Sequence, residues 1–81
     1  MPTPSPSLFP SLVQKELTSA RQKNPPMHSL HEAFAILLEE VDELKAEVWL
    51  RPHLRNRKAL LTELVQVAAM AQRAAEDLGL V

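Results

Sequence analysis

The chain has 81 residues, a formal net charge of −1 and no cysteine. This length predicts one small domain, near the size at which a single core is marginal, so we expect association of subunits to add buried surface. The near-neutral charge gives no reason to expect nucleic acid or an anionic membrane as a partner, and no apolar run approaches the roughly 18–20 residues of a membrane span. The lack of cysteine excludes disulfides and thiolate metal sites.

The composition favours helices. Apolar residues make up 46% of the chain, with one Gly and few aromatic residues, and they recur at the helical period. We therefore predict an all-α fold, a small antiparallel bundle of about three helices that is completed by oligomerisation. Residues 1–7 alternate Pro with Ser and Thr and predict a flexible tail, followed by a single helical domain over residues 8–81. Because the N-terminus lacks a basic region followed by an apolar core, we expect no secretory signal and a soluble, cytoplasmic protein.

The first helix is expected from Leu8 to about Gln22. Ser11 and Gln14 fit a capping box at its start. Asn24-Pro25-Pro26 ends it, since proline cannot continue the backbone hydrogen bonding and restricts the residue before it.

The second helix begins at a capping box formed by Ser29 and Glu32 and ends near Leu50, before Pro52. At about 100° per residue, six of its residues form one apolar stripe. These residues are Leu30, Phe34, Leu37, Val41, Leu44 and Val48. A short, basic connection over residues 51–56 predicts that the second and third helices lie antiparallel.

The third helix is expected to begin after Asn56, which can cap it, and to run to about Leu78, with Gly79 as its C-cap. It carries an apolar stripe at the same period. The stripe consists of Leu60, Leu64, Val67, Ala71, Ala74 and Leu78.

Acidic residues follow the margin of these stripes. Glu40, Glu43 and Glu47 share a flank of the second helix, where their charges repel one another and raise their pKa values unless a cation lies between them. Glu63 and Gln66 form a second pair of oxygen-bearing side chains, three residues apart, on the third helix. Two antiparallel helices can direct both sets into one cavity, as in carboxylate-metal bundles.

This pattern resembles the MazG-like all-α nucleotide pyrophosphohydrolases, whose signature is E-E-x-x-E on one helix and E-x-x-D on the next. Residues 39–43 match the first half in full, and residues 63–66 match the second half except at Gln66, which stands where the family has Asp. The resemblance extends over roughly residues 28–78. Each half is a weak motif by itself, and the pair is moderately specific.

The resemblance implies hydrolysis of nucleoside triphosphates to the monophosphate and pyrophosphate, by dimers or larger helical assemblies. It also implies Mg²⁺, or Mn²⁺ in its place, bound by the residues that match the signature. These residues are Glu40, Glu43, Glu63 and Gln66. Oxygen ligands suit Mg²⁺, which commonly links carboxylates to substrate phosphates.

A further carboxylate outside the ligand set is needed to orient water. Glu39 is the catalytic candidate and Glu47 the alternative, and the sequence does not choose between them. Basic side chains must offset the triphosphate charge. Those available are Lys45, Arg51, Arg55, Arg57, Lys58 and Arg73.

Two interpretations compete with that of a metal-dependent pyrophosphohydrolase. An acidic run on a helix is usually a solvated face, and for Glu39 and Asp42 we prefer that interpretation to metal binding. The whole chain is alternatively a catalytically weak or inactive MazG-like protein that binds nucleotides or serves in assembly, for which Gln66 is the main evidence.

Overall fold

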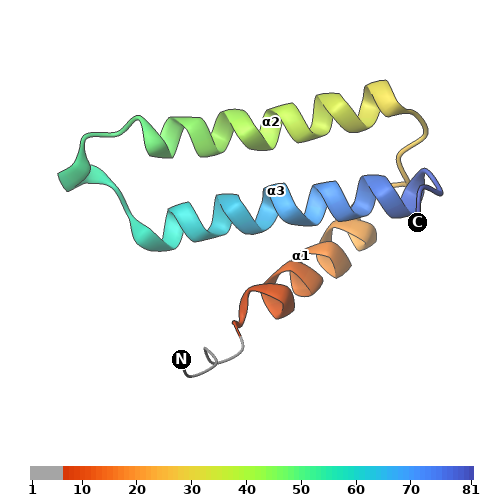
Figure 1. Cartoon of the computed structure of the whole chain (residues 1–81), viewed down its shortest axis with the longest axis horizontal. Helices are drawn as coiled ribbons and strands as arrows, with labels where there is room; N and C mark the ends of the chain where they lie inside the picture. The colour runs from red at the N-terminus through yellow and green to blue at the C-terminus, as the bar shows by residue number, and fades with distance from the viewer. Residues whose placement is uncertain (1–6) are drawn as a thin grey trace, which may run out of the picture.

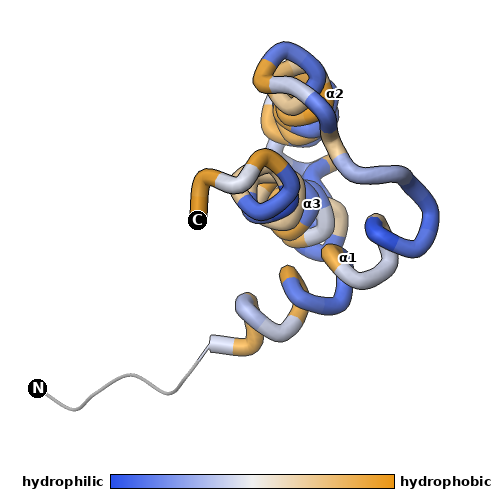
Figure 2. Tube along the Cα trace, turned by 90° about the vertical axis from the view of Figure 1, so that its right-hand side faces the viewer, coloured by the Kyte–Doolittle hydropathy of each residue, from blue (hydrophilic) through white to orange (hydrophobic). Residues whose placement is uncertain are grey.

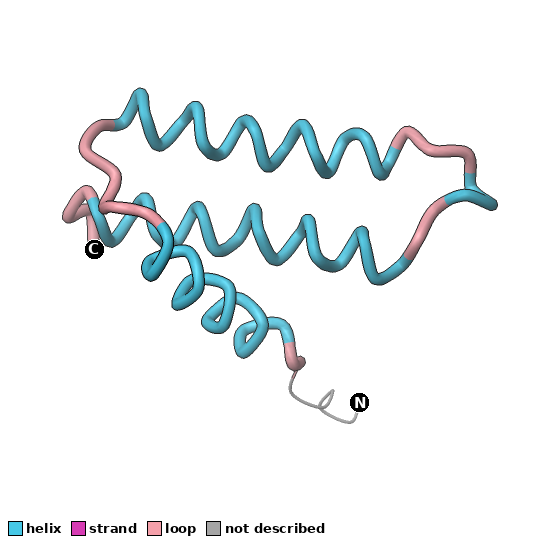
Figure 3. Tube along the Cα trace, turned by 180° about the vertical axis from the view of Figure 1, so that it is seen from behind, coloured by secondary structure: helices cyan, strands magenta, loops and turns pink. Residues whose placement is uncertain are grey.

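The computed structural model describes residues 7–81, which form three α-helices and one short 3₁₀ turn and contain no strand (Figures 1 and 3). The helices are α1 (Phe9–Lys23), α2 (Leu30–Val48) and α3 (Arg57–Asp77), and the turn η1 (Pro52–Leu54) lies between α2 and α3. The predicted all-α class is confirmed. The tail predicted for residues 1–7 lies, except for Ser7, outside the described residues.

α3 is the central helix. α1 and α2 both pack on α3, and the view along the helices shows α3 between them (Figure 2). α2 and α3 are antiparallel, as the short connection predicts. α1 runs in the same general direction as α3 and diverges from it toward the N-terminal ends of the two helices (Figures 1 and 3).

Local signals set the ends of α2 and α3. The Ser29 hydroxyl accepts a hydrogen bond from the Glu32 backbone N–H at 3.0 Å, so the predicted cap of α2 is confirmed. The Asn56 side chain accepts hydrogen bonds from the backbone N–H groups of Lys58 and Ala59, in the first turn, at 2.8 and 3.1 Å and caps α3. Gly79 has φ +68°, and Leu80 N–H donates to Ala75 O at 2.9 Å, which is the geometry of a glycine helix stop.

The predicted capping box of α1 is wrong. The helix begins at Phe9, so Ser11 lies inside its first turn and caps nothing. Ser7 takes part instead, since its hydroxyl accepts from the Phe9 backbone N–H at 3.0 Å. Proline at position 10 explains the earlier start, because its missing N–H and fixed φ are suited to the first helical turn.

The core lies mainly between α1 and α3. Val13, Leu17 and Ala20 of α1 are buried, and Met27 of the following loop is only 2% exposed. From α2, by contrast, Ala33 is the one buried residue among those described. The buried hydrophobic residues of α3 are Val65, Ala69, Met70 and Ala74.

The apolar stripe predicted on α2 is covered only in part, since Leu37 and Leu44 are half-buried and Leu37 packs against the core. Leu30 and Phe34 are each 67% exposed, and Val41 and Val48 are also exposed. The packing face extends onto the adjacent flank, where Ala33 is buried, and the half-buried Glu40 and Glu47 continue along the same side. Within one chain, α2 therefore leaves most of its apolar stripe uncovered.

A network of charged groups joins the end of α3 to α1 and to the loop before α2. Asp77 accepts hydrogen bonds from the Arg21 guanidinium at 2.6 Å and from the Met27 backbone N–H at 2.9 Å. Arg73 lies 3.5 Å from Asp77 and donates to Pro25 O at 2.6 Å. We call these residues, Arg21, Pro25, Met27, Arg73 and Asp77, the Asp77 network. It fixes the three helices at one end of the molecule.

None of the helices formed by residues 7–81 has the length and apolar character needed to cross a bilayer.

Candidate metal site

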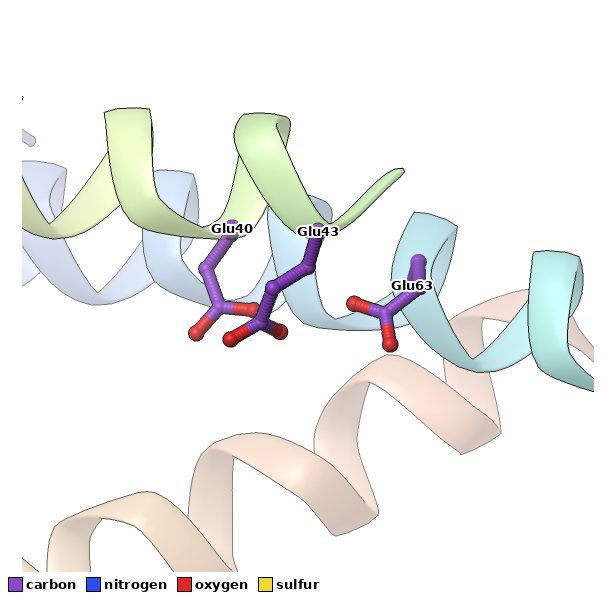
Figure 4. Close-up of side chains that lie close together, drawn as sticks. All are labelled: Glu40, Glu43 and Glu63. Atoms are coloured by element: carbon purple, nitrogen blue, oxygen red, sulfur yellow. The ribbon is translucent and has the colours of Figure 1, made fainter. Parts of the chain in front are cut away.

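Three carboxylates meet where α2 faces the first half of α3. Glu40 and Glu43 come from α2 and Glu63 comes from α3, and one carboxylate oxygen of each lies within 4.8 Å of the others. Their side chains point to the side of the α2–α3 pair on which α1 lies (Figure 4). The predicted convergence of these three residues is therefore found in the structure.

The helical spacing produces this arrangement. Residues three apart lie on one side of a helix, so Glu40 and Glu43 project together from α2. The antiparallel course of α3 then brings Glu63 opposite them. Glu40 and Glu63 are half-buried whereas Glu43 is exposed, so the group lies at the edge of the helix interface and opens to solvent.

The three carboxylates are not balanced by a basic side chain. Among residues 7–81, the ion pairs within 4.0 Å involve only Arg21 and Arg73, which lie in the Asp77 network. Burial and the charges of Glu43 and Glu63 raise the pKa of Glu40 from 4.5 to about 7. Burial, followed by the contact with Glu43, also raises the pKa of Glu63. The site therefore favours a proton or a cation.

Gln66 lies among the carboxylates. Oriented to satisfy its hydrogen-bonding groups, its side-chain amide donates to Glu40 Oε2 at 2.9 Å and to Glu63 Oε2 at 3.2 Å. The amide thus links α2 to α3 in the absence of an ion. To act as a metal ligand, Gln66 would have to turn its carbonyl oxygen toward the site and its N–H groups away. Its predicted role as a ligand remains a prediction.

The neighbouring carboxylates differ in their burial and in their effect on the pKa values of the three converging residues. Glu39 and Asp42 are exposed. Glu47 is half-buried, and its charge contributes to the raised pKa of Glu63. Glu16, a half-buried residue of α1, was not among the predicted site residues, yet its charge contributes to the raised pKa of Glu40. Its signal in the sequence is its position between Val13 and Leu17, on the margin of the buried face of α1.

Four of the six basic residues considered for phosphate binding lie in the connection between α2 and α3 or in the first turn of α3, namely Arg51, Arg55, Arg57 and Lys58. Arg73 is buried in the Asp77 network and is therefore not available to bind phosphate. Arg55 donates to the carbonyl oxygen of Val48 at 2.8 and 3.1 Å and closes the connection between α2 and α3. Lys58, at the start of α3, remains exposed on the part of that helix that precedes Glu63.

The donor set fits a hard divalent cation. All the converging groups are oxygen donors, no basic side chain of residues 7–81 forms an ion pair with them, and an ion would relieve the repulsion that raises the pKa of Glu40. Glu40, Glu43 and Glu63 could therefore bind a metal ion.

Comparison with protein-family models, with curated proteins and with solved structures gives no match. Any function must therefore be inferred from the residues of this chain.

Proposed function

We propose that this protein is a Mg²⁺-dependent nucleoside triphosphate pyrophosphohydrolase, which forms a nucleoside monophosphate and pyrophosphate. The observation that supports the proposal most is the convergence of Glu40, Glu43 and Glu63 from two antiparallel helices, at the spacing of the MazG-like signature. In this proposal the three carboxylates hold Mg²⁺, or Mn²⁺, and Gln66 occupies the position of the fourth ligand.

The bound ion would supply charge stabilisation to the phosphate oxygens. The chain's own contribution is positional. Glu40 and Glu43 are fixed three residues apart on α2, and Glu63 is fixed across the interface by the packing of α2 on α3. Such fixed groups need little rearrangement when charge develops during the reaction.

Glu39 was the predicted candidate to orient the attacking water, with Glu47 as the alternative. Glu39 is exposed, and its charge is not among those that shift the pKa values of Glu40 or Glu63. Glu47 is half-buried and acts on Glu63. Of the two, we favour Glu47 for this role, and replacement of each by Gln compares them directly in a turnover assay.

A second candidate function is nucleotide binding or assembly with weak or no turnover. The hydrogen bonds from Gln66 to Glu40 and Glu63 favour it, because they satisfy two of the carboxylates without an ion. The Gln side chain also offers the ion a neutral oxygen, which attracts Mg²⁺ less strongly than a carboxylate does.

The test is pyrophosphate release from a panel of nucleoside triphosphates, with and without Mg²⁺. The primary proposal predicts Mg²⁺-dependent release that is lost in Glu40→Gln and Glu63→Gln and retained in Asp42→Asn, an exposed acidic control on the same helix. Nucleotide binding without release would instead establish the second candidate. Absence of both binding and release would contradict the two candidates together.

We further propose that the chain is at least a dimer, with the uncovered α2 stripe as the interface. The stripe repeats at alternating spacings of four and three residues, which is the pattern of a helix that packs against a partner helix. Replacement of Phe34 by Glu should then dissociate the assembly in light scattering, whereas Glu at the exposed position Ala46, away from the stripe, should not. A compact wild-type monomer at micromolar concentration would contradict the proposal.

A further inference from the structure

The divergence of α1 from α3 leaves a groove between their N-terminal halves. It has a volume of about 340 Å³, at the lower end of the range of about 300–1,000 Å³ that is usual for small-ligand sites. Its apolar lining comes from Leu12 of α1 and from Leu61 and Val65 of α3. Leu12 and Leu61 are 37% and 42% exposed, so the groove presents open apolar surface. We call it the α1–α3 groove.

The groove shares a wall with the candidate metal site. Gln66 lines the groove and lies within 3.2 Å of carboxylate oxygens of both Glu40 and Glu63. Glu16 lines it as well, and its charge acts on Glu40. A single small molecule can therefore contact the groove and an ion on the three carboxylates at the same time.

Two lysines give the groove a cationic component. Lys15 of α1 and Lys58 of α3 both line it. Neither forms an ion pair within 4.0 Å with another side chain of residues 7–81. Their ammonium groups are therefore available to an anionic ligand. Glu16 is the one acidic residue among the described residues of the lining, and its charge would repel such a ligand.

We infer that the α1–α3 groove binds the nucleoside part of a nucleotide, with Lys15 and Lys58 contacting its phosphates. The ligand must combine an apolar, uncharged body with an anionic end beside a cation site, and a nucleoside polyphosphate has this composition. This inference depends on the proposed function, since it assigns the substrate's organic part to a place next to the same carboxylates. It also predicts that nucleotide binding requires the divalent cation. Without the cation, the phosphates would be repelled by Glu16, Glu40, Glu43 and Glu63.

The direct test is NMR mapping on the whole chain. The probes are the α,β-imido analogues of ATP and UTP, which resist cleavage between the α- and β-phosphates, and inorganic tripolyphosphate, each with Mg²⁺ and with EDTA. We expect all three probes with Mg²⁺ to shift the signals of Glu40, Glu43 and Glu63. Only the nucleotide analogues should also shift the signals of Leu12, Leu61 and Val65. Identical shift maps for nucleotide and tripolyphosphate would overturn the inference.

Two threonines provide a matched pair of variants. Thr62 lines the groove and Thr18 does not, yet both are exposed and each donates its hydroxyl to the carbonyl oxygen four residues earlier in its helix. Thr62→Trp should fill the groove and weaken the binding of the imido analogues by about tenfold, while it leaves tripolyphosphate binding unchanged. Thr18→Trp should change neither. Equal effects of the two variants would contradict a site in the groove.

The lysines are tested in the same way. Lys15→Ala and Lys58→Ala should each weaken the binding of the analogues by about tenfold, through loss of a charge-assisted contact. Lys23→Ala, at an exposed position outside the groove, should leave the affinity for the analogues within about twofold of the wild type. Bound analogue without turnover of the natural nucleotides would refute the proposed hydrolysis and retain the groove. Turnover that persists unchanged in Thr62→Trp would retain the hydrolysis and refute the groove.

Discussion

Two groups of acidic side chains join helices in this protein, and they are built in opposite ways. Asp77 is surrounded by donors, since it accepts from the Arg21 guanidinium and the Met27 backbone N–H and lies 3.5 Å from Arg73. Glu40, Glu43 and Glu63 face one another, and the donor among them is the neutral amide of Gln66. One group contains its own counter-charges, and the other lacks them.

The pKa values follow this difference. The backbone N–H of Met27 and the Arg21 guanidinium lower the pKa of Asp77 below its ordinary value of 3.8. Burial and neighbouring carboxylates raise the pKa of Glu40 to about 7. A charge that is neutralised within the fold stabilises the fold, whereas unbalanced charges on rigid helices cost stability until a cation binds. The first arrangement is structural, and the second is typical of a functional site.

The largest expected effect is at the balanced group. Asp77→Ala would leave Arg73 buried, with a side chain only 5% exposed, and without its acidic partner. Breaking such a pair costs about 3–5 kcal/mol of unfolding free energy, so we expect a loss of this size in chemical denaturation. Asp77→Asn, which retains an acceptor for Met27 N–H, should lose less.

Asp42→Ala provides the control for that measurement. Asp42 is exposed on α2, so its removal should change the unfolding free energy by less than about 0.5 kcal/mol. Similar losses in Asp77→Ala and Asp42→Ala would show that the Asp77 network does not hold the helices together.

The next effect is at the unbalanced group. A ligand that binds only the folded state at 100 times its dissociation constant adds about 2.7 kcal/mol, so Mg²⁺ or Mn²⁺ should raise the melting temperature relative to EDTA. Glu40→Gln and Glu63→Gln should lose this rise and, because they remove like charges, should melt higher than the wild type in EDTA. Coincident wild-type curves in metal and in chelator would contradict a metal site.

The pH dependence of stability should also separate the two groups. The folded-state pKa of Glu40 is raised. Its protonated form therefore contributes to the free energy of unfolding fully below about pH 4.5, and this contribution is lost as pH rises through about 7. The pKa of Asp77 is lowered, so its contribution is present above about pH 3.8 and is lost as pH falls below that value. Without divalent ions, stability should fall from about pH 5 to about pH 8, and Glu40→Gln should flatten this decline. Wild-type stability that is constant over this range would contradict the raised pKa.

A smaller effect is expected from substitution of Gln66. Gln66→Asp replaces the donor to Glu40 and Glu63 with another carboxylate, so it should lower the melting temperature in EDTA. It should also tighten Mg²⁺ binding and speed pyrophosphate release, because a carboxylate attracts the ion more strongly. Asp at the exposed position Gln14 is the control. A fully active wild type whose metal dependence does not change in Gln66→Asp would show that Gln66 is not a ligand.

The sequence predicted the parts of this structure that depend on local signals. Ser29, Asn56 and Gly79 act within a few residues of themselves, and each marks a helix end as predicted. The convergence of Glu40, Glu43 and Glu63 followed from helical spacing and one short connection, so it was predictable as well.

The features that the sequence did not predict depend on contacts distant in the chain. Arg21 and Asp77 are 56 residues apart, and no periodicity pairs them. The face by which α2 packs on α3 was predicted only in part, because the exposed stripe residues such as Phe34 fit a partner helix from another chain equally well. The place of Glu16 beside Glu40 depends on the angle at which α1 crosses α3, which composition and periodicity do not determine.

The most direct test of the account is an NMR titration of side-chain carboxyl ¹³C signals, with and without saturating Mg²⁺. In the absence of the ion, Glu40 should titrate near pH 7 and Asp77 below its ordinary 3.8. Mg²⁺ should lower the apparent pKa of Glu40 by more than about one unit, because the ion competes with the proton, and should leave Asp77 unchanged. A Glu40 titration curve that is the same with and without Mg²⁺ would contradict the central claim that these carboxylates bind the ion.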